Sequence, residues 1–107
     1  MVAKSSSGPA MVYHIHINGV NAKLEGFEQS IYVFRRYANK ISEVHLIVVK
    51  RASLVTAHRI ALLKTELHNQ IILNDARPNC IVSILHIVDT ITKSRPPGPF
   101  IQLEFIF

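Results

Sequence analysis

Alternation of apolar and polar residues marks the first regular element of the chain, between positions 12 and 18. The apolar side of this alternation is Tyr13, Ile15 and Ile17, and the polar side is His14, His16 and Asn18. A period of two residues is typical of a strand with one face on a core and one in water. The pattern therefore predicts a strand that ends at Asn18-Gly19.

A helical period follows directly. Apolar residues recur at spacings of 3, 4, 3, 3 and 4 at Leu24, Phe27, Ile31, Phe34, Tyr37 and Ile41. This spacing predicts an amphipathic helix, for which Asn21 is a suitable N-cap. Gly26 lies in its first turns and weakens them by roughly 1 kcal/mol relative to Ala.

The next segments read as three strands. Residues 43–50 form an apolar run that suits a buried strand, and residues 51–58 are a mixed connection. Alternation then predicts a strand over 59–69, with Leu63, Thr65 and Leu67 towards the core. A shorter strand is expected over 71–75.

A second helix is predicted over 79–93. Pro78 lies near its start and Asn79 is a good cap residue. Its apolar stripe is Ile81, Ile84, Leu85, Val88 and Ile91. Because the spacing follows i, i+3, i+4, i+7, the helical interpretation is preferred although β-branched residues are frequent.

The resulting order, β-α-β-β-β-α, predicts an α+β two-layer sandwich. Its sheet would be four-stranded and mixed, with the first two strands parallel and the remaining strands an antiparallel meander. A right-handed crossover and short connections would place both helices on one face. Residues 1–10 are expected to be a flexible N-terminal arm, and residues 11–95 a single domain.

Residues 96–107 form a Pro-rich break and an apolar C-terminal strand or tail. The break is Pro96-Pro97-Gly98-Pro99, which neither a helix nor a sheet ladder accommodates. Beyond it, Ile101, Leu103, Phe105 and Phe107 alternate with other residues. Such a strand would cover the sheet, pair with an edge strand, or cross to the partner in a homodimer.

Composition narrows the class of protein. The chain has 107 residues, 49% of them apolar and 18% charged, which excludes intrinsic disorder. The lone Cys80 excludes an intramolecular disulfide framework and a cysteine-built zinc site. No apolar run reaches the roughly 18 residues of a membrane span. Since the N-terminus also lacks a secretory signal, we expect a cytoplasmic protein with no membrane partner.

The formal net charge of +5 favours a polyanionic partner. Six basic residues flank the two predicted helices: Arg35, Arg36, Lys40, Arg77, Lys93 and Arg95. With both helices on one face, these side chains would share a surface that contacts RNA phosphates. The alternative is an ordinary solvated helix face. Lys50, Arg51, Arg59 and Lys64 would either extend that surface or keep a hairpin soluble.

The histidines offer a different chemistry. His14 and His16 share a strand face, and His45 and His68 on neighbouring predicted strands could share it too. Imidazoles bind zinc, copper or nickel, so these four are weak metal-ligand candidates. The alternative is a row of polar residues on the wet face of the sheet. No carboxylate partner is fixed by the spacing, and no cofactor is predicted.

Three segments together carry a family resemblance. They are Ile15-His16-Ile17-Asn18-Gly19-Val20-Asn21, the run from Phe34 to Leu46, and the run from Asn79 to Ile91. The chain resembles the family of ribosome hibernation promoting factors and ribosome-associated inhibitors over roughly residues 12–93. The resemblance implies the β-α-β-β-β-α fold, binding to the small ribosomal subunit where mRNA and tRNA normally lie, and no enzymatic activity.

The function predicted from the sequence is therefore a non-enzymatic, ribosome-binding translation inhibitor that contacts small-subunit rRNA. Two alternatives remain open. One is a metal- or ligand-binding module that uses the histidine face. The other is a homo-oligomeric interaction protein that has lost RNA binding.

Overall fold

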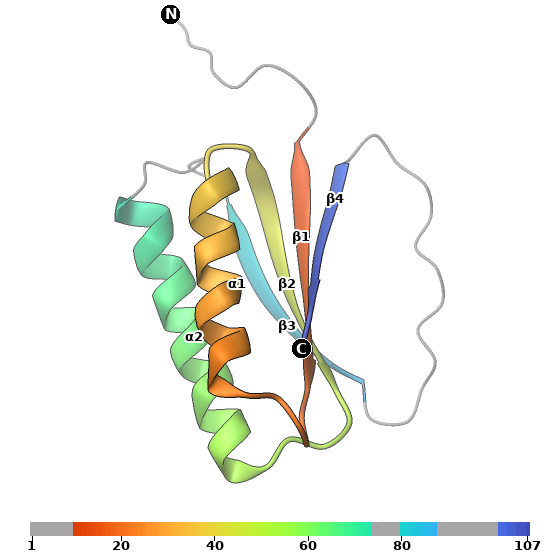
Figure 1. Ribbon diagram of the computed structural model, residues 1–107. Coiled ribbons are helices and arrows are strands. Elements are labelled where there is room, and N and C mark those ends of the chain that lie inside the picture. The colour runs from red at the N-terminus through yellow and green to blue at the C-terminus, as the bar shows by residue number, and fades with distance from the viewer. Residues whose placement is uncertain (1–9, 74–79, 88–100) are drawn as a thin grey trace, which may run out of the picture.

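The computed structural model describes residues 10–73, 80–87 and 101–107. Six elements follow one another in these residues (Figure 1). They are β1 (Met11–Asn18), α1 (Leu24–Tyr37), β2 (Ile41–Val49), α2 (Leu54–Leu73), β3 (Ile81–Ile87) and β4 (Ile101–Ile106). The predicted order β-α-β-β-β-α is therefore wrong, and the observed order is β-α-β-α-β-β.

The four strands form one sheet in the order β3-β2-β1-β4. All three neighbouring pairs are parallel, so the prediction of a mixed sheet with an antiparallel meander is wrong. Parallel neighbours cannot be joined by a hairpin, because both strands begin at the same end of the sheet. The chain must therefore return to that end before the next strand begins. Helix α1 makes that return between β1 and β2, and α2 makes it between β2 and β3.

Both helices lie on the same side of the sheet, next to each other (Figure 1). Their buried residues join one apolar core with alternate residues of the strands. The strand residues of this core include Tyr13, Ile15 and Ile17 of β1 together with Val44, Leu46 and Val48 of β2. The predicted inward side of the first strand is therefore confirmed.

Tyr13 shows how the core accommodates a polar group. Its side chain is fully buried, and its hydroxyl donates a hydrogen bond of 3.0 Å to the backbone oxygen of Ser30 in α1. Burial raises the pKa of the Tyr13 phenol above its usual value, so the hydroxyl stays protonated and able to donate. A satisfied donor of this kind fixes α1 against β1 without leaving an unpaired group in the core.

The first helix is confirmed with two corrections. It ends at Tyr37, and Ile41 begins β2 instead of continuing the helix. Asn21 is not the cap: the N-cap position is Lys23, which makes no side-chain capping bond. Asn18 instead accepts hydrogen bonds from the backbone amides of Val20 and Asn21, which shapes the turn after β1.

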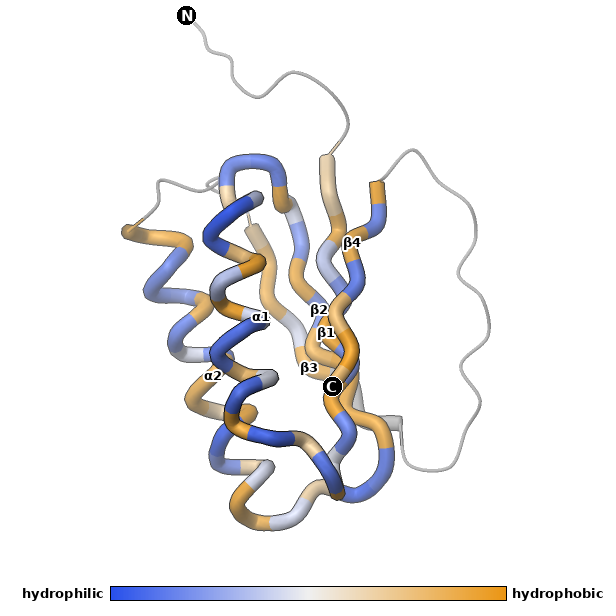
Figure 2. Tube along the Cα trace, in the orientation of Figure 1, coloured by the Kyte–Doolittle hydropathy of each residue, from blue (hydrophilic) through white to orange (hydrophobic). Residues whose placement is uncertain are grey.

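The strands predicted over 59–69 and 71–75 are wrong, because this region is the 20-residue helix α2. Its buried residues are Thr56, Ile60, Leu63, Leu67 and Gln70, at spacings of 4, 3, 4 and 3. Two polar members hide this stripe from a search for apolar residues. Apolar positions also recur along the rest of α2 (Figure 2), and they create a false alternation.

The helix predicted over 79–93 is also wrong within the described residues, where Ile81–Ile87 form strand β3. Val82 is buried and Ile84 packs on the core, which is the alternation of a strand. A short run of β-branched residues fits both periods, and pairing with β2 decides between them. Residues 88–93 lie outside the described residues.

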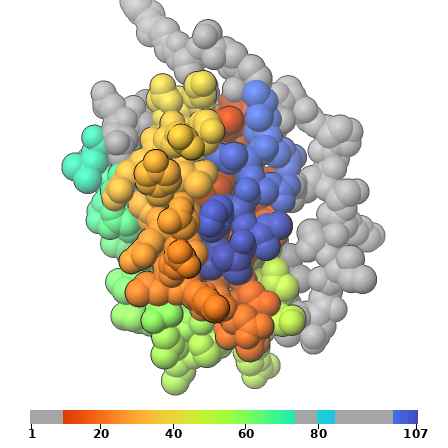
Figure 3. Space-filling model, viewed as in Figure 1, coloured from red at the N-terminus to blue at the C-terminus, as the bar shows by residue number. Residues whose placement is uncertain are grey.

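The apolar C-terminal segment forms β4, which pairs in parallel with β1 of the same chain. Figure 3 shows β4 next to α1 on one face of the molecule. The rings of Phe27 and Phe107 meet edge to face, with 4.8 Å between centroids. A Cβ atom at Gly26 would lie 2.0 Å from the Phe107 ring, so only glycine leaves room for this contact.

Gly26→Ala tests whether the missing side chain at Gly26 is what seats Phe107. Alanine favours a helix by about 0.8 kcal/mol, but overpacking typically costs about 1–3 kcal/mol. We expect a lower free energy of unfolding, measured with urea. In a Phe107→Ala background, the same substitution should instead be neutral or stabilising. A stabilising Gly26→Ala in the wild-type background would contradict this packing.

Candidate functional site

Three exposed basic residues gather where α1 ends: Arg35, Arg36 and Lys40, here called the α1 basic cluster. Arg35 and Arg36 lie in the last turn of the helix, where cations interact favourably with the helix dipole. The chain then turns, with the Lys40 amide bonded to the Tyr37 carbonyl at 2.9 Å. The backbone oxygen of Lys40 accepts from the Met11 amide, so the turn is tied to the start of β1.

An aromatic side chain extends the cluster along α1. The Arg36 guanidinium carbon lies 6.0 Å from the centroid of the Tyr32 ring, one helical turn earlier. Tyr32 is 57% exposed, although it is on the same helix as the buried Phe27, Ile31 and Phe34. The outer surface of α1 therefore presents a planar cation and a ring side by side, next to two further positive charges.

These positive charges are not neutralised by neighbours. Among the residues that the structure describes, none of the Lys and Arg side chains forms an ion pair with a carboxylate. The two close contacts between a basic side chain and a carboxylate found there both involve histidines, which are charged only when protonated. Within the described part of the chain, no carboxylate pairs with the α1 basic cluster, so its charges face an external anion.

The remaining predicted RNA-binding residues, Arg77, Lys93 and Arg95, lie outside the described residues. Lys50 and Arg51 follow the carboxyl end of β2. The α1 basic cluster instead lies at the opposite end of the strands, where α1 ends and β2 begins. Lys50 has a positive φ of 67°, in the left-handed region that few residues other than glycine adopt. Of the four charges predicted around a hairpin, Lys50 and Arg51 therefore lie at the other end of the strands, and Arg59 and Lys64 lie on α2.

Three of the four candidate histidines lie together on the sheet face that is turned away from the helices. His14 and His45 are paired in register, and their rings stack with centroids 5.2 Å apart. The centroids of the His16 and His14 rings are 6.3 Å apart. His14 is only 4% exposed, so this part of the face is not wet. His68 is on α2 and does not join them.

Sequence reasoning missed the partners of these histidines. His45 lies between Ser83 and Glu43: its Nδ1 is 2.8 Å from the Ser83 hydroxyl, and its Nε2 is 2.8 Å from a Glu43 oxygen. His16 Nε2 lies 3.2 Å from a Glu104 oxygen. We call these six residues the histidine row: Ser83, His45, Glu43, His14, His16 and Glu104. The feature that groups these residues is the register of the strands, which aligns Ser83, His45, His14 and Glu104 across the sheet.

The histidine row does not have the arrangement of a metal centre. In the described part of the chain, no group of three or more His, Cys, Asp or Glu side chains is placed to hold a metal ion. Both ring nitrogens of His45 are already hydrogen-bonded. His45 and His16 make polar contacts with Ser83, Glu43 and Glu104, which occupy ring nitrogens that a metal ion would need.

The order hydroxyl, imidazole, carboxylate is that of an activated nucleophile and its base. Acyl-transfer chemistry also needs free donors for the oxyanion. Strand β2, which carries His45 and Glu43, has a neighbour on both sides, so its backbone amides are used in the sheet, whereas Ser83 lies on the edge strand β3. The contacts from Ser83 through His45 to Glu43 form a hydrogen-bond network that satisfies polar groups on a half-buried face.

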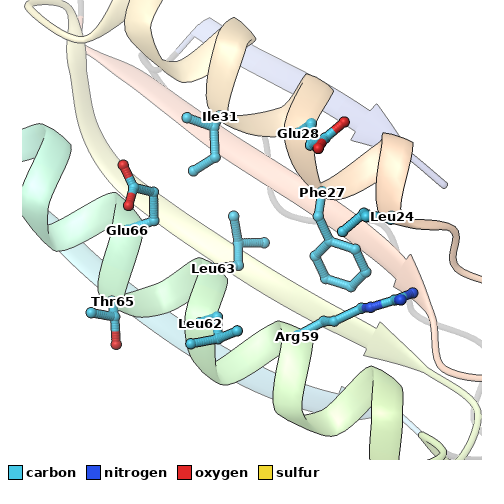
Figure 4. Close-up of a pocket in the computed structure, with 9 residues that line it drawn as sticks. All are labelled: Leu24, Phe27, Glu28, Ile31, Arg59, Leu62, Leu63, Thr65 and Glu66. Carbon is cyan, nitrogen blue, oxygen red and sulfur yellow. The ribbon is translucent and has the colours of Figure 1, made fainter.

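A largely apolar groove runs between the two helices on their outer side (Figure 4), with a volume of about 380 Å³. Its apolar lining is Leu24, Phe27, Ile31, Leu62 and Leu63. Arg59 lies at the end next to Leu24, and Glu66 lies on the side of Ile31 (Figure 4). This groove was not predicted, because the residues of α2 were not predicted to form a helix.

Comparison with protein families, with curated proteins and with solved structures finds no match to this chain. Within the described residues, neither helix combines the length and the apolar character that crossing a membrane requires.

The histidine row predicts one tautomer of His45. A carboxylate only accepts, so Nε2 of neutral His45 carries the proton and Nδ1 accepts from the Ser83 hydroxyl. Two-bond ¹H–¹⁵N correlation spectra of the neutral ring should show the Nε2–H form. Ser83→Ala should move the Nδ1 resonance and leave that of His68 unchanged. An Nδ1–H form of His45 would contradict the network.

Proposed function

We propose that this protein is a non-enzymatic RNA-binding protein that contacts its partner through the α1 basic cluster and Tyr32. The observation that carries this proposal is the cluster itself: three exposed cations without carboxylate partners among the described residues, next to an exposed ring. The net charge of +5 adds a long-range attraction for any polyanion.

Two kinds of contact would operate at this surface. Arg35 and Lys40 would bind phosphates and release counterions, which supplies affinity without reading sequence. Tyr32 and Arg36 would offer flat surfaces on which unpaired bases stack, a contact worth about 1–3 kcal/mol per base. Unpaired RNA loops satisfy both requirements, because their bases are free to leave the helix.

The geometry favours this function over a metal- or ligand-binding role for the histidine face. The His45 nitrogens are engaged by Ser83 and Glu43, whereas the cations of the α1 basic cluster point to no carboxylate among the described residues. An external partner would add contacts to the cluster without breaking any described hydrogen bond or ion pair. On the histidine face, it would have to displace them.

The particular RNA that we propose is the rRNA of the small ribosomal subunit, with translation inhibition as the outcome and the cytoplasm as the location. This narrower proposal is based on the resemblance of sequence segments to hibernation factors, whose implied order β-α-β-β-β-α differs from the observed order of elements. Two of the three resembling segments cover β1 with its exit and the end of α1 with β2. The second of these segments contains the whole α1 basic cluster.

Removing the cluster should weaken RNA binding and its dependence on salt. We expect Arg35→Gln/Arg36→Gln/Lys40→Gln to bind a single-stranded RNA at least tenfold more weakly in low salt. The slope of log affinity against log salt should fall in magnitude by about 2, because roughly three phosphate contacts are lost. Fluorescence anisotropy over a salt series measures both quantities.

The matched control is Lys23→Gln/Lys50→Gln/Arg51→Gln, which removes the same charge at the opposite end of the strands. This control should retain most of the affinity and the slope. Equal losses in the two triple variants would mean that net charge alone drives binding, and would rule out the α1 basic cluster as the site. Tyr32→Ala should weaken binding without changing the slope, since stacking releases no counterions.

Sedimentation through sucrose tests the narrower proposal. The protein should travel with small ribosomal subunits at low salt and leave them as salt rises, and the cluster variant should remain at the top. Binding to free RNA without any binding to subunits would retain the RNA-binding proposal and exclude the ribosome as partner.

A further inference from the structure

Helix α2 carries apolar residues on its outer side as well as on the side that packs on the sheet. Besides its buried stripe, Val55 and Leu62 are 59% and 55% exposed, and Leu73 at its end is 76% exposed. A helix with one partner normally shows charged and polar residues on its outer side. The apolar residues on the groove side of α2 therefore indicate a second partner.

The groove between α1 and α2 is the place where this excess of apolar surface is hollowed (Figure 4). Leu24 of α1 is 51% exposed, and with Leu62 it borders a space of about 380 Å³. Phe27, Ile31 and Leu63 form its lining. An apolar side chain from another molecule that entered this space would be removed from water on several sides.

The charges around the groove identify the occupant. Arg59 and Glu66 are both half-buried at its border, seven residues apart on α2 and so separated by about 10 Å along the helix. Leu62 and Leu63 lie midway between them. A twofold axis through this midpoint brings Arg59 of one copy to Glu66 of the other, twice, around a shared apolar centre.

We propose that a second copy of this chain docks in the groove, so that two α2 helices cross antiparallel and form a homodimer. Within one chain, Glu66 accepts a hydrogen bond of 2.8 Å from Gln70, and no described ion pair includes Arg59. Glu28 of α1 also borders the groove and adds negative charge for a cation of the other copy. An isologous interface needs this self-complementary order of charges.

The size of the surface suits a dimer of moderate strength. A 20-residue helix is about 30 Å long, and the groove side of the helix pair is about two helix diameters wide. Such a face buries roughly 600 Å² per copy, which is at the lower end of specific interfaces. This interface leaves the histidine row, on the opposite face of the sheet, uncovered, and the proposal of a dimer does not rest on the proposed RNA binding.

Sedimentation equilibrium of the full chain, from about 1 µM to about 200 µM, tests the proposal. The wild-type protein should pass from monomer to dimer within this range. Leu62→Glu, at an exposed position that tolerates a charge, should weaken the dimer at least tenfold. Ile106→Glu is the matched control: it is 74% exposed on β4, outside the groove, and should dimerise as the wild type does.

A charge exchange makes the test specific. Arg59→Glu and Glu66→Arg should each weaken the dimer about tenfold, and the double variant should restore the affinity to within about threefold of the wild type. A wild-type monomer at the highest concentration would overturn the proposal. So would a dimer that survives Leu62→Glu, or one that is lost with Ile106→Glu, which would place the interface at the C-terminal strand.

Discussion

Parallel pairing of β1 with β2, and of β2 with β3, is the constraint on which the other features depend. Each pairing requires a crossover, and crossovers in one direction along a sheet, with the usual right hand, lie on one side. One face of the sheet thus receives both helices and becomes the apolar core. The other face is left for the histidine row, and the outer surfaces of the helices for the α1 basic cluster and the groove.

The elements that the sequence predicted well are those whose pattern fits one period only. The alternation around Ile15 and the helical spacing from Phe27 to Phe34 each admit a single interpretation, and β1 and α1 follow it. In α2, the buried stripe includes Thr56 and Gln70, so the period is invisible to hydropathy. In β3, only the partner strand decides between helix and strand. Tertiary pairing thus determined what local pattern left ambiguous.

The candidate sites were predictable to the extent that they are local. Arg35, Arg36 and Lys40 lie within one helical turn of each other or just beyond it, so their grouping could be predicted from the sequence alone. The histidine row could not, because it joins residues up to 90 positions apart, from His14 to Glu104, through the strand register. Its carboxylate and hydroxyl members become visible only when that register is known. The groove is likewise a product of two helices, one of which was not predicted.

The pattern of backbone nuclear Overhauser effects in the labelled protein is the most direct test of the order of the elements. The fold predicts an unbroken series of amide-to-amide contacts from Leu54 to Leu73 and parallel contacts between β2 and β3. Strong contacts between α-protons of facing antiparallel strands, with residues 59–69 extended, would contradict it. That result would restore the mixed sheet and remove the groove, while the α1 basic cluster would keep its place at the end of α1.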